Sequence, residues 1–281
     1  MWPSGPARSI SPSRARLAPV ARALQAVVAT WRAMSMDRRR TSGIVGYVAI
    51  WLLRPVFELI AVALIYGTAH PTLLRYVVVA LAANAFVFNA IFYVSETLDR
   101  ERLNGTLVSL FLAPCPRFSW LSGFTLVGGV ETALIAVITL VFGHIAFGVT
   151  YHPDLPAVVV ALALFLAALW GLGYIFAAIG LLIKKGNQLS NLVYPFAILL
   201  GGVYYPVTAL PGWLRYPAHV LPLGYGMQAL ANATLYHKGI ANLAPQLLPL
   251  AAFALVLPCA GSVAFHLLER IVRVRGELDL Y

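Results

Sequence analysis

Residues 157–183 read AVVVALALFLAALWGLGYIFAAIGLLI and contain no charged side chain. A helix needs about 20 mostly apolar residues to cross the hydrocarbon core of a bilayer, which is roughly 30 Å thick. This stretch is long enough, and five further apolar stretches are separated from it and from one another by polar residues or by glycine and proline. The sequence therefore predicts six membrane spans, at Ile44–Tyr66, Leu73–Val94, Phe118–Phe142, Ala157–Ile183, Leu192–Leu210 and Leu247–Leu268.

The composition of the whole chain agrees with this interpretation. Of the 281 residues, 60% are hydrophobic and 11% are charged, whereas soluble domains contain about 45–50% apolar and about 25% charged residues. So few polar residues cannot cover the core of a soluble domain, and a chain this apolar would not remain solvated in a disordered state. Composition excludes these two classes and predicts an all-α integral membrane protein.

The basic residues indicate how the chain is oriented in the membrane. The formal net charge is +10, and most of the basic residues flank the apolar stretches. Lys and Arg are retained on the cytoplasmic side of membranes. If the loops alternate sides, sixteen of the 20 basic residues share the side of both termini, and the other side holds Arg75, Arg215 and Lys238. We expect a multi-pass protein of a prokaryotic plasma (inner) membrane with both termini in the cytoplasm. Its environment is the lipid bilayer, and nucleic acid is not expected as a partner.

The N-terminal region divides into two parts ahead of the first span. Residues 1–16 are rich in Pro, Ser and Arg and predict a disordered basic tail. In residues 17–40, apolar side chains recur at three- and four-residue steps with arginines on other faces, which predicts an amphipathic helix lying on the cytoplasmic membrane surface. Residues 41–281 form a single predicted six-span transmembrane domain.

Between the second and third predicted spans, residues 95–105 read SETLDRERLNG. Acidic residues come first and basic residues follow, which suits the dipole of a helix. Ser95 can cap the start of such a helix and Gly105 can end it. The pattern favours a short charged helix held between two membrane helices and facing the cytoplasm. The alternative is a solvated turn whose charges only keep the loop out of the lipid.

After the fifth predicted span, residues 205–217 read YPVTALPGWLRYP and residues 221–225 read LPLGY. Four prolines fall within residues 206–222, and proline interrupts the hydrogen bonds of a helix interior. A straight helix therefore cannot continue through this segment, and we expect the chain to break and turn back near the outer leaflet.

These two segments carry a resemblance to a known family. Residues 101–114, ERLNGTLVSLFLAP, are similar to the E-R-x-x-G-T-L-x-x-L-x-x-x-P signature of type-2 ATP-binding-cassette (ABC) exporter permeases, which export drugs, polysaccharides and lipids. Residues 205–222 resemble the FP-x-x-x-LP-x-W … LP segment of the same family, with Tyr205 in place of the more usual Phe. The resemblance extends over nearly the whole chain, although only these two motifs are specific.

The resemblance implies roles for particular residues. In the family, the first segment is a coupling helix that inserts into a cleft on an ATPase subunit. The positions matched to it here, with two neighbours at the start of the segment, are Glu96, Arg100, Glu101, Arg102, Gly105 and Thr106. The second segment would form short re-entrant helices between spans five and six, and its matched positions are Tyr205, Pro206, Pro211, Trp213 and Pro222.

The implied function is transport out of the cytoplasm by alternating access, with a drug, lipid, glycolipid or polysaccharide as substrate. The partners would be two ABC ATPase subunits and a second permease copy or homologue, with ATP and magnesium bound by the ATPases. The chain itself contains no G-x-x-x-x-G-K-[S/T] phosphate-binding loop, since Lys184-Lys185-Gly186 lacks the preceding glycine and the following hydroxyl residue. We therefore expect no catalytic residue, no cofactor and no metal site in this chain.

Three ionisable residues lie inside predicted spans, where charge is costly. Arg54 and Glu58 are four residues apart and close enough to pair, either as a structural pair or as part of a transport path. Glu131 has no basic partner evident in its own span, and either faces a cavity or is buried in its protonated form. An alternative function follows from these three residues, a proton-coupled secondary transporter, although such proteins usually contain repeated spans and no repeat is visible. A membrane-embedded enzyme would need converging acid, base or metal-binding residues, which the outer loops do not offer.

Neutral polar residues in the spans have simpler expected roles. Asn84 and Asn89 are expected to hydrogen bond between packed helices. Tyr194, like the other tyrosines near the fifth span, is expected to anchor the protein at the membrane interface. The alternative is that some of these rings stack on sugar rings or on a flat drug that leaves the pathway.

Overall fold

The computed structural model describes residues 53–66, 71–105, 117–183 and 185–274, and the regular elements in these ranges are all helices. The predicted tail at 1–16, the predicted amphipathic helix at 17–40 and Thr106 lie outside the described residues. The first predicted span is described only over residues 53–66, which are helical.

Four helices in the described part of the chain are long and apolar enough to cross a membrane. The first, Pro71–Leu103, consists of α2 (Pro71–Phe88), the π-helical turn η1 (Asn89–Tyr93) and α3 (Val94–Leu103). The second lies in α5 (Arg117–Phe147) and the third is α6 (Leu155–Ile183). The fourth combines η3 (Ile240–Leu243) with most of α10 (Ala244–Val274). These helices agree with the second, third, fourth and sixth predicted spans.

The fifth predicted span was wrong at its end. The prediction placed it at Leu192–Leu210, whereas α7 runs from Gly186 to Gly201. With 16 residues and a rise of about 1.5 Å per residue, α7 is about 24 Å long. Its first turn is bonded to a side chain from α3, which is a contact that local sequence does not reveal.

The proline-rich segment after α7 breaks into short pieces, as predicted. They are the 3₁₀ turn η2 (Val207–Ala209) and the helices α8 (Gly212–His219) and α9 (Pro222–Leu235). Ten of the 14 residues of α9 are buried, and α9 packs against α2, α6, α7 and α10. With 14 residues, α9 is too short to cross a bilayer, and longer helices surround it.

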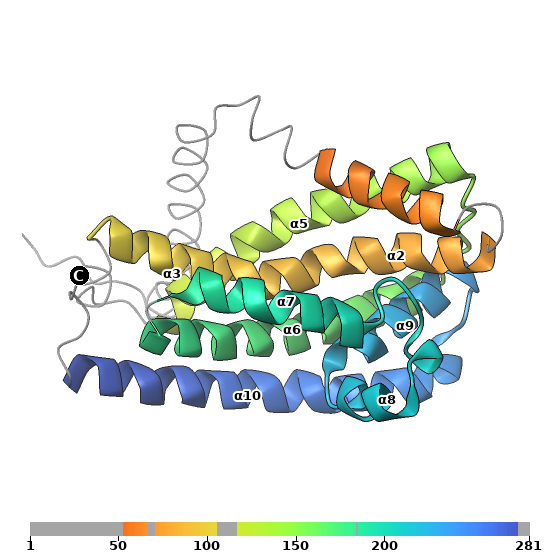
Figure 1. Ribbon diagram of the computed structural model, residues 1–281. Coiled ribbons are helices and arrows are strands. Elements are labelled where there is room, and N and C mark those ends of the chain that lie inside the picture. The colour runs from red at the N-terminus through yellow and green to blue at the C-terminus, as the bar shows by residue number, and fades with distance from the viewer. Residues whose placement is uncertain (1–52, 67–70, 106–116, 184, 275–281) are drawn as a thin grey trace, which may run out of the picture.

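The long helices lie side by side and define two ends of the bundle (Figure 1). At one end, which we call the α3 end, α3 lies near the start of α7 and the final turns of α6 and α10. At the opposite end, the α8 end, lie α8 and the loops that join α5 to α6 and α9 to α10.

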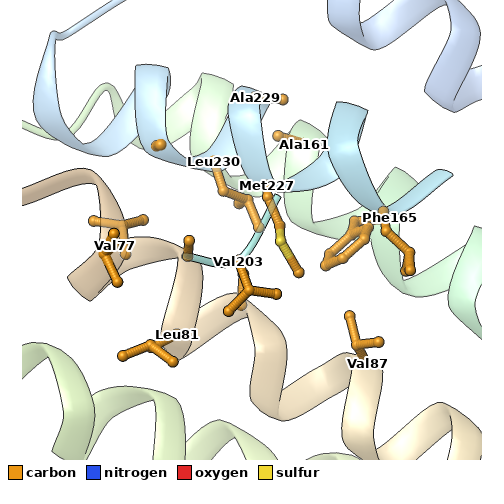
Figure 2. Packing of buried hydrophobic residues seen from close by; sticks show 14 of the residues in the cluster. Val77, Leu81, Val87, Ala161, Phe165, Val203, Met227, Ala229 and Leu230 are labelled. Atoms are coloured by element: carbon orange, nitrogen blue, oxygen red, sulfur yellow. The ribbon is translucent and has the colours of Figure 1, made fainter. Parts of the chain in front are cut away.

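A continuous apolar core joins α2, α6 and α9 near the α8 end. Figure 2 shows Met227 of α9 directed toward Phe165 of α6, with Val203 beside them. All three side chains are fully buried. Close packing also joins α6 to α10, because a Cβ atom on Gly171 would overlap the backbone of Leu257 and Pro258.

Candidate coupling helix and intramembrane cavity

The charged segment 95–105 is the end of a long helix and not a separate one. The helix from α2 passes through η1 into α3 without a break. The expectation that Ser95 caps a new helix was therefore wrong, because a continuous helix frees no backbone amides at this point. Ser95 is 1% exposed, and its hydroxyl has no hydrogen-bond partner among the residues described.

The other end of α3 agrees with the prediction. The helix ends at Leu103, and Gly105 has a φ of +69°, in the left-handed region that glycine adopts readily. The backbone N–H of Gly105 donates to the carbonyl of Arg102 at 3.0 Å, which closes the last turn. The first-turn acid and a last-turn base form an ion pair on the helix surface, with Arg100 Nη2 2.7 Å from Glu96 Oε1.

Two further side chains bond α3 to the neighbouring helices. Asp99 Oδ2 accepts a hydrogen bond from the backbone N–H of Asn187 in the first turn of α7, at 2.8 Å. Arg102 Nη2 donates to the carbonyl of Leu181 in α6, at 3.2 Å. The side chain of Arg102 is only 6% exposed, so in this structure it makes its contacts within the subunit. Asp99 was not among the predicted coupling residues, because its partner is far along the chain.

A cavity of about 260 Å³ lies beside this long helix. It is partly open and is lined by residues 53–66, the α2–η1–α3 helix, α5 and α7. The long helix contributes residues at three- and four-residue steps, so that one face of it lines the cavity: Leu81, Asn84, Ala85, Phe88, Asn89, Phe92, Tyr93 and Glu96. The α3 charges and the cavity wall therefore belong to the same helix, and η1 falls within the lining, where π-helical turns often mark functional sites.

Arg54 and Glu58 form the predicted pair and also line the cavity. Arg54 Nε lies 3.0 Å from Glu58 Oε1, and the guanidinium lies over the ring of Phe88, 4.1 Å from its centroid. Both side chains remain partly exposed. The pair thus satisfies its own charges and adds a cation–π contact at the edge of the cavity.

Glu131 lies outside the cavity lining, although α5 contributes Thr132, Ile135 and Thr139 to it. Glu131 is partly exposed on α5. The two expected positions, facing a cavity or buried in the protonated form, stay predictions.

Tyr194 of α7 belongs to the cavity wall, a place that agrees better with the alternative of contact along a pathway than with an interfacial anchor. Its hydroxyl accepts a hydrogen bond from Asn84 Nδ2 at 2.8 Å. This bond joins α2 to α7, as predicted for Asn84. The helical spacing of Asn84, Phe88 and Phe92 was the signal that could have indicated a polar and aromatic face in α2.

The predicted outer residues are spread over the turns between α7 and α9. Pro206 and Pro211 precede η2 and α8, and Pro222 is buried in the first turn of α9. Tyr205 donates from its hydroxyl to the carbonyl of Leu199, at 3.0 Å. Trp213 is exposed on α8.

The fold and these two features define a helical membrane protein with a partly polar cavity and a charged helix end, which is the organisation expected of a transport subunit. The comparison with known families is specific: the family model of the ABC-2 type transporter matches residues 25–235. The chain belongs to this family, whose membrane domain is the permease component of type-2 ABC transporters and is not itself catalytic. Family members normally work with ATP-binding subunits. No curated protein matches the chain.

Proposed function

We propose that this chain is the membrane subunit of an ATP-driven exporter that moves a drug, lipid, glycolipid or polysaccharide out of the cytoplasm by alternating access. Two ABC ATPase subunits would bind at the α3 end, supply ATP and magnesium, and act on a pair of permease subunits. Membership of the ABC-2 type transporter family supports this function over a proton-coupled transporter.

The observation that carries the proposal is the continuity of α3 with the cavity-lining helix. Pro71–Leu103 is one helix that has Glu101 and Arg102 near its end and the cavity lining farther along. A force applied to α3 by a bound ATPase would reach the cavity without crossing a flexible joint.

The contact between α3 and α7 extends this connection. Because Asp99 bonds to the first turn of α7, and α7 places Tyr194 in the cavity wall, displacement of α3 would move two walls of the cavity together. ATP binding can shift the permease between two states only to the extent that the ATPase binds them with different affinity.

The test is a double substitution, Glu101→Ala with Gly105→Ala, in the complex of the permease with its ATPase. Alanine at Gly105 would meet no atom within 4 Å but would be strained by about 1–2 kcal/mol in the left-handed conformation. We expect normal membrane insertion, ATP hydrolysis that no longer responds to substrate, and at least a tenfold loss of export, since ten-fold corresponds to only about 1.4 kcal/mol of coupling energy. Normal export by this variant would contradict the proposal.

A matched control is available at the α8 end. Gly148 has a φ of +62° and an equally open environment, and Asp154 is an acidic residue in the same loop. The double variant Gly148→Ala with Asp154→Ala carries the same kinds of change away from the proposed docking site, and should retain coupled hydrolysis and export.

The purified permease alone should hydrolyse no nucleotide until the ATPase is added.

A further inference from the structure

The described lining of the cavity comes from four segments of one copy of the chain. Its volume of about 260 Å³ is slightly below the lower limit of about 300 Å³ for pockets that hold small molecules, and the cavity is partly open. A polymer could not be accommodated in this space, whereas a molecule of two or three rings could.

The polar groups that face the cavity include one buried hydrogen-bond acceptor that has no donor in the described part of the chain. Asn84 is 3% exposed, and its Oδ1 atom has no hydrogen-bond partner within the described part of the chain. The amide Nδ2 atom is already used in the bond to Tyr194. Thr132 and Thr139 donate their hydroxyl protons to backbone carbonyls of α5, so each offers only oxygen lone pairs. Since a buried acceptor without a donor is unfavourable, the wall is suited to a ligand that donates.

The remaining wall is mostly apolar and includes a cluster of aromatic rings. Phe88 and Phe92 are stacked with ring centroids 4.4 Å apart. Tyr194 meets both rings edge to face at 5.4 Å. Flat apolar groups gain favourable contacts against such rings.

The charges at the cavity are balanced. Arg54 is paired with Glu58, and Glu96 is paired with Arg100. A charged ligand would have to compete with one of these pairs and would lose its hydration among apolar walls. The balance of charge favours an uncharged ligand.

We propose that this cavity is a binding site for an aromatic, uncharged and mostly apolar small molecule that carries a hydrogen-bond donor, and that Asn84 Oδ1 accepts from this donor. That such a molecule is the cargo rests on the proposed function. The binding itself does not, because it requires neither an ATPase nor nucleotide.

The experiment uses the full chain in phosphatidylcholine nanodiscs without ATPase. The probe is N-phenyl-1-naphthylamine, an uncharged two-part aromatic molecule with one N–H donor, whose fluorescence rises in apolar surroundings. Two competitors have a related shape: 1-phenoxynaphthalene replaces the N–H by an ether oxygen, and 8-anilino-1-naphthalenesulfonate adds a negative charge. Empty nanodiscs provide the background from lipid.

We expect saturable binding of the amine with one site per chain, and affinities about tenfold weaker for the ether and for the sulfonate, since each lacks or opposes one interaction. Asn84→Leu should weaken binding of the amine about tenfold and leave binding of the ether unchanged. Asn191→Leu is the matched control, because Asn191 is an exposed residue of α7 outside the cavity lining, and it should bind like the original chain.

Ala85→Phe should abolish saturable binding of both uncharged molecules, because Ala85 lines the cavity. If Ala85→Phe is not monodisperse, Ala85→Leu is used in its place, and it should weaken the binding of both uncharged molecules. The proposal would be overturned if Asn84→Leu and the cavity-filling variant both bound the amine as tightly as the original chain does. A stoichiometry of one site per two chains would also overturn it. If the Glu101 and Gly105 variant loses coupling but the original chain does not bind the amine saturably, the transport function stays supported and only this binding site is rejected.

Discussion

The α3 end and the α8 end of the bundle differ in the balance of polar and apolar contacts. At the α3 end, α3 is joined to α6 and α7 by hydrogen bonds of Arg102 and Asp99, beside a small apolar cluster that includes Leu98. At the α8 end, α9 is held by close apolar packing around Met227 and Phe165 (Figure 2).

The difference has a physical consequence for movement. A hydrogen bond at a helix end can be exchanged for one to water or to a partner at a net cost of about 0.5–1.5 kcal/mol. A close-packed core has no equivalent replacement, because separation of its side chains leaves a void. We therefore expect the α3 end to rearrange when an ATPase binds and the α8 end to remain fixed.

The largest expected effect concerns the α8 end. Met227 is fully buried, so Met227→Ala should lower the free energy of unfolding by about 2–5 kcal/mol through loss of contacts and formation of a cavity. Thermal unfolding of the purified chain in detergent measures the change. Leu255→Ala, at an exposed position of α10, should change it far less. Equal losses from the two variants would show that α9 is not held by close packing.

The next effect concerns the α3 end. Asp99→Ala removes the carboxylate that caps α7 and should lower the free energy of unfolding by about 0.5–2 kcal/mol. It should also reduce export per ATP hydrolysed in the complex, because α7 is no longer bonded to α3. Asp154→Ala removes a comparable cap, the bond from the Ala157 N–H to Asp154 Oδ1 at 3.2 Å, and should affect stability but not coupling. Equal coupling in the two variants would remove the proposed link between α3 and α7.

The smallest effect concerns a polar contact at the α8 end. The hydroxyl of Tyr151 donates to the carbonyl of Leu140 at 2.8 Å, and burial raises the pKa of Tyr151 to about 12. Tyr151→Phe should lower the free energy of unfolding by about 1 kcal/mol at neutral pH.

The difference between wild type and Tyr151→Phe should depend on pH in one direction. Because the folded pKa lies above the unfolded value of about 10, the stabilisation is fully present below pH 10 and is lost as the pH rises through 12. Unfolding measured at a series of pH values checks this. A difference that decreases between pH 7 and 9 would mean that another group controls it.

Several features followed correctly from local sequence. Apolar length identified four of the membrane helices, and the prolines between Pro206 and Pro222 required the break after α7. Gly105 ended α3 as expected. The spacing of Arg54 and Glu58 brought them together, because residues four apart share one face of a helix.

Two of the differences from the prediction share one cause. Ser95 lies inside a helix because η1 carries α2 into α3, and the first turn of α7 is bonded to Asp99 from 88 residues away. Tyr194 lines a cavity together with residues of α2 and α5, and it is bonded to Asn84 of α2. For α7 and Tyr194 the decisive neighbour comes from a different helix, and the local pattern contains no record of it.

By itself the sequence determined that this is a helical membrane protein, that one loop is charged, and that two motifs match an ABC-2 permease. These properties depend on apolar length, on charge and on the order of residues along the chain, which are all local. Only the tertiary structure decided that the charged loop continues a cavity-lining helix, and that Asn84, Thr132 and Tyr194 meet around one space. Such meetings depend on how helices pack, and packing is set by contacts between residues far apart in sequence.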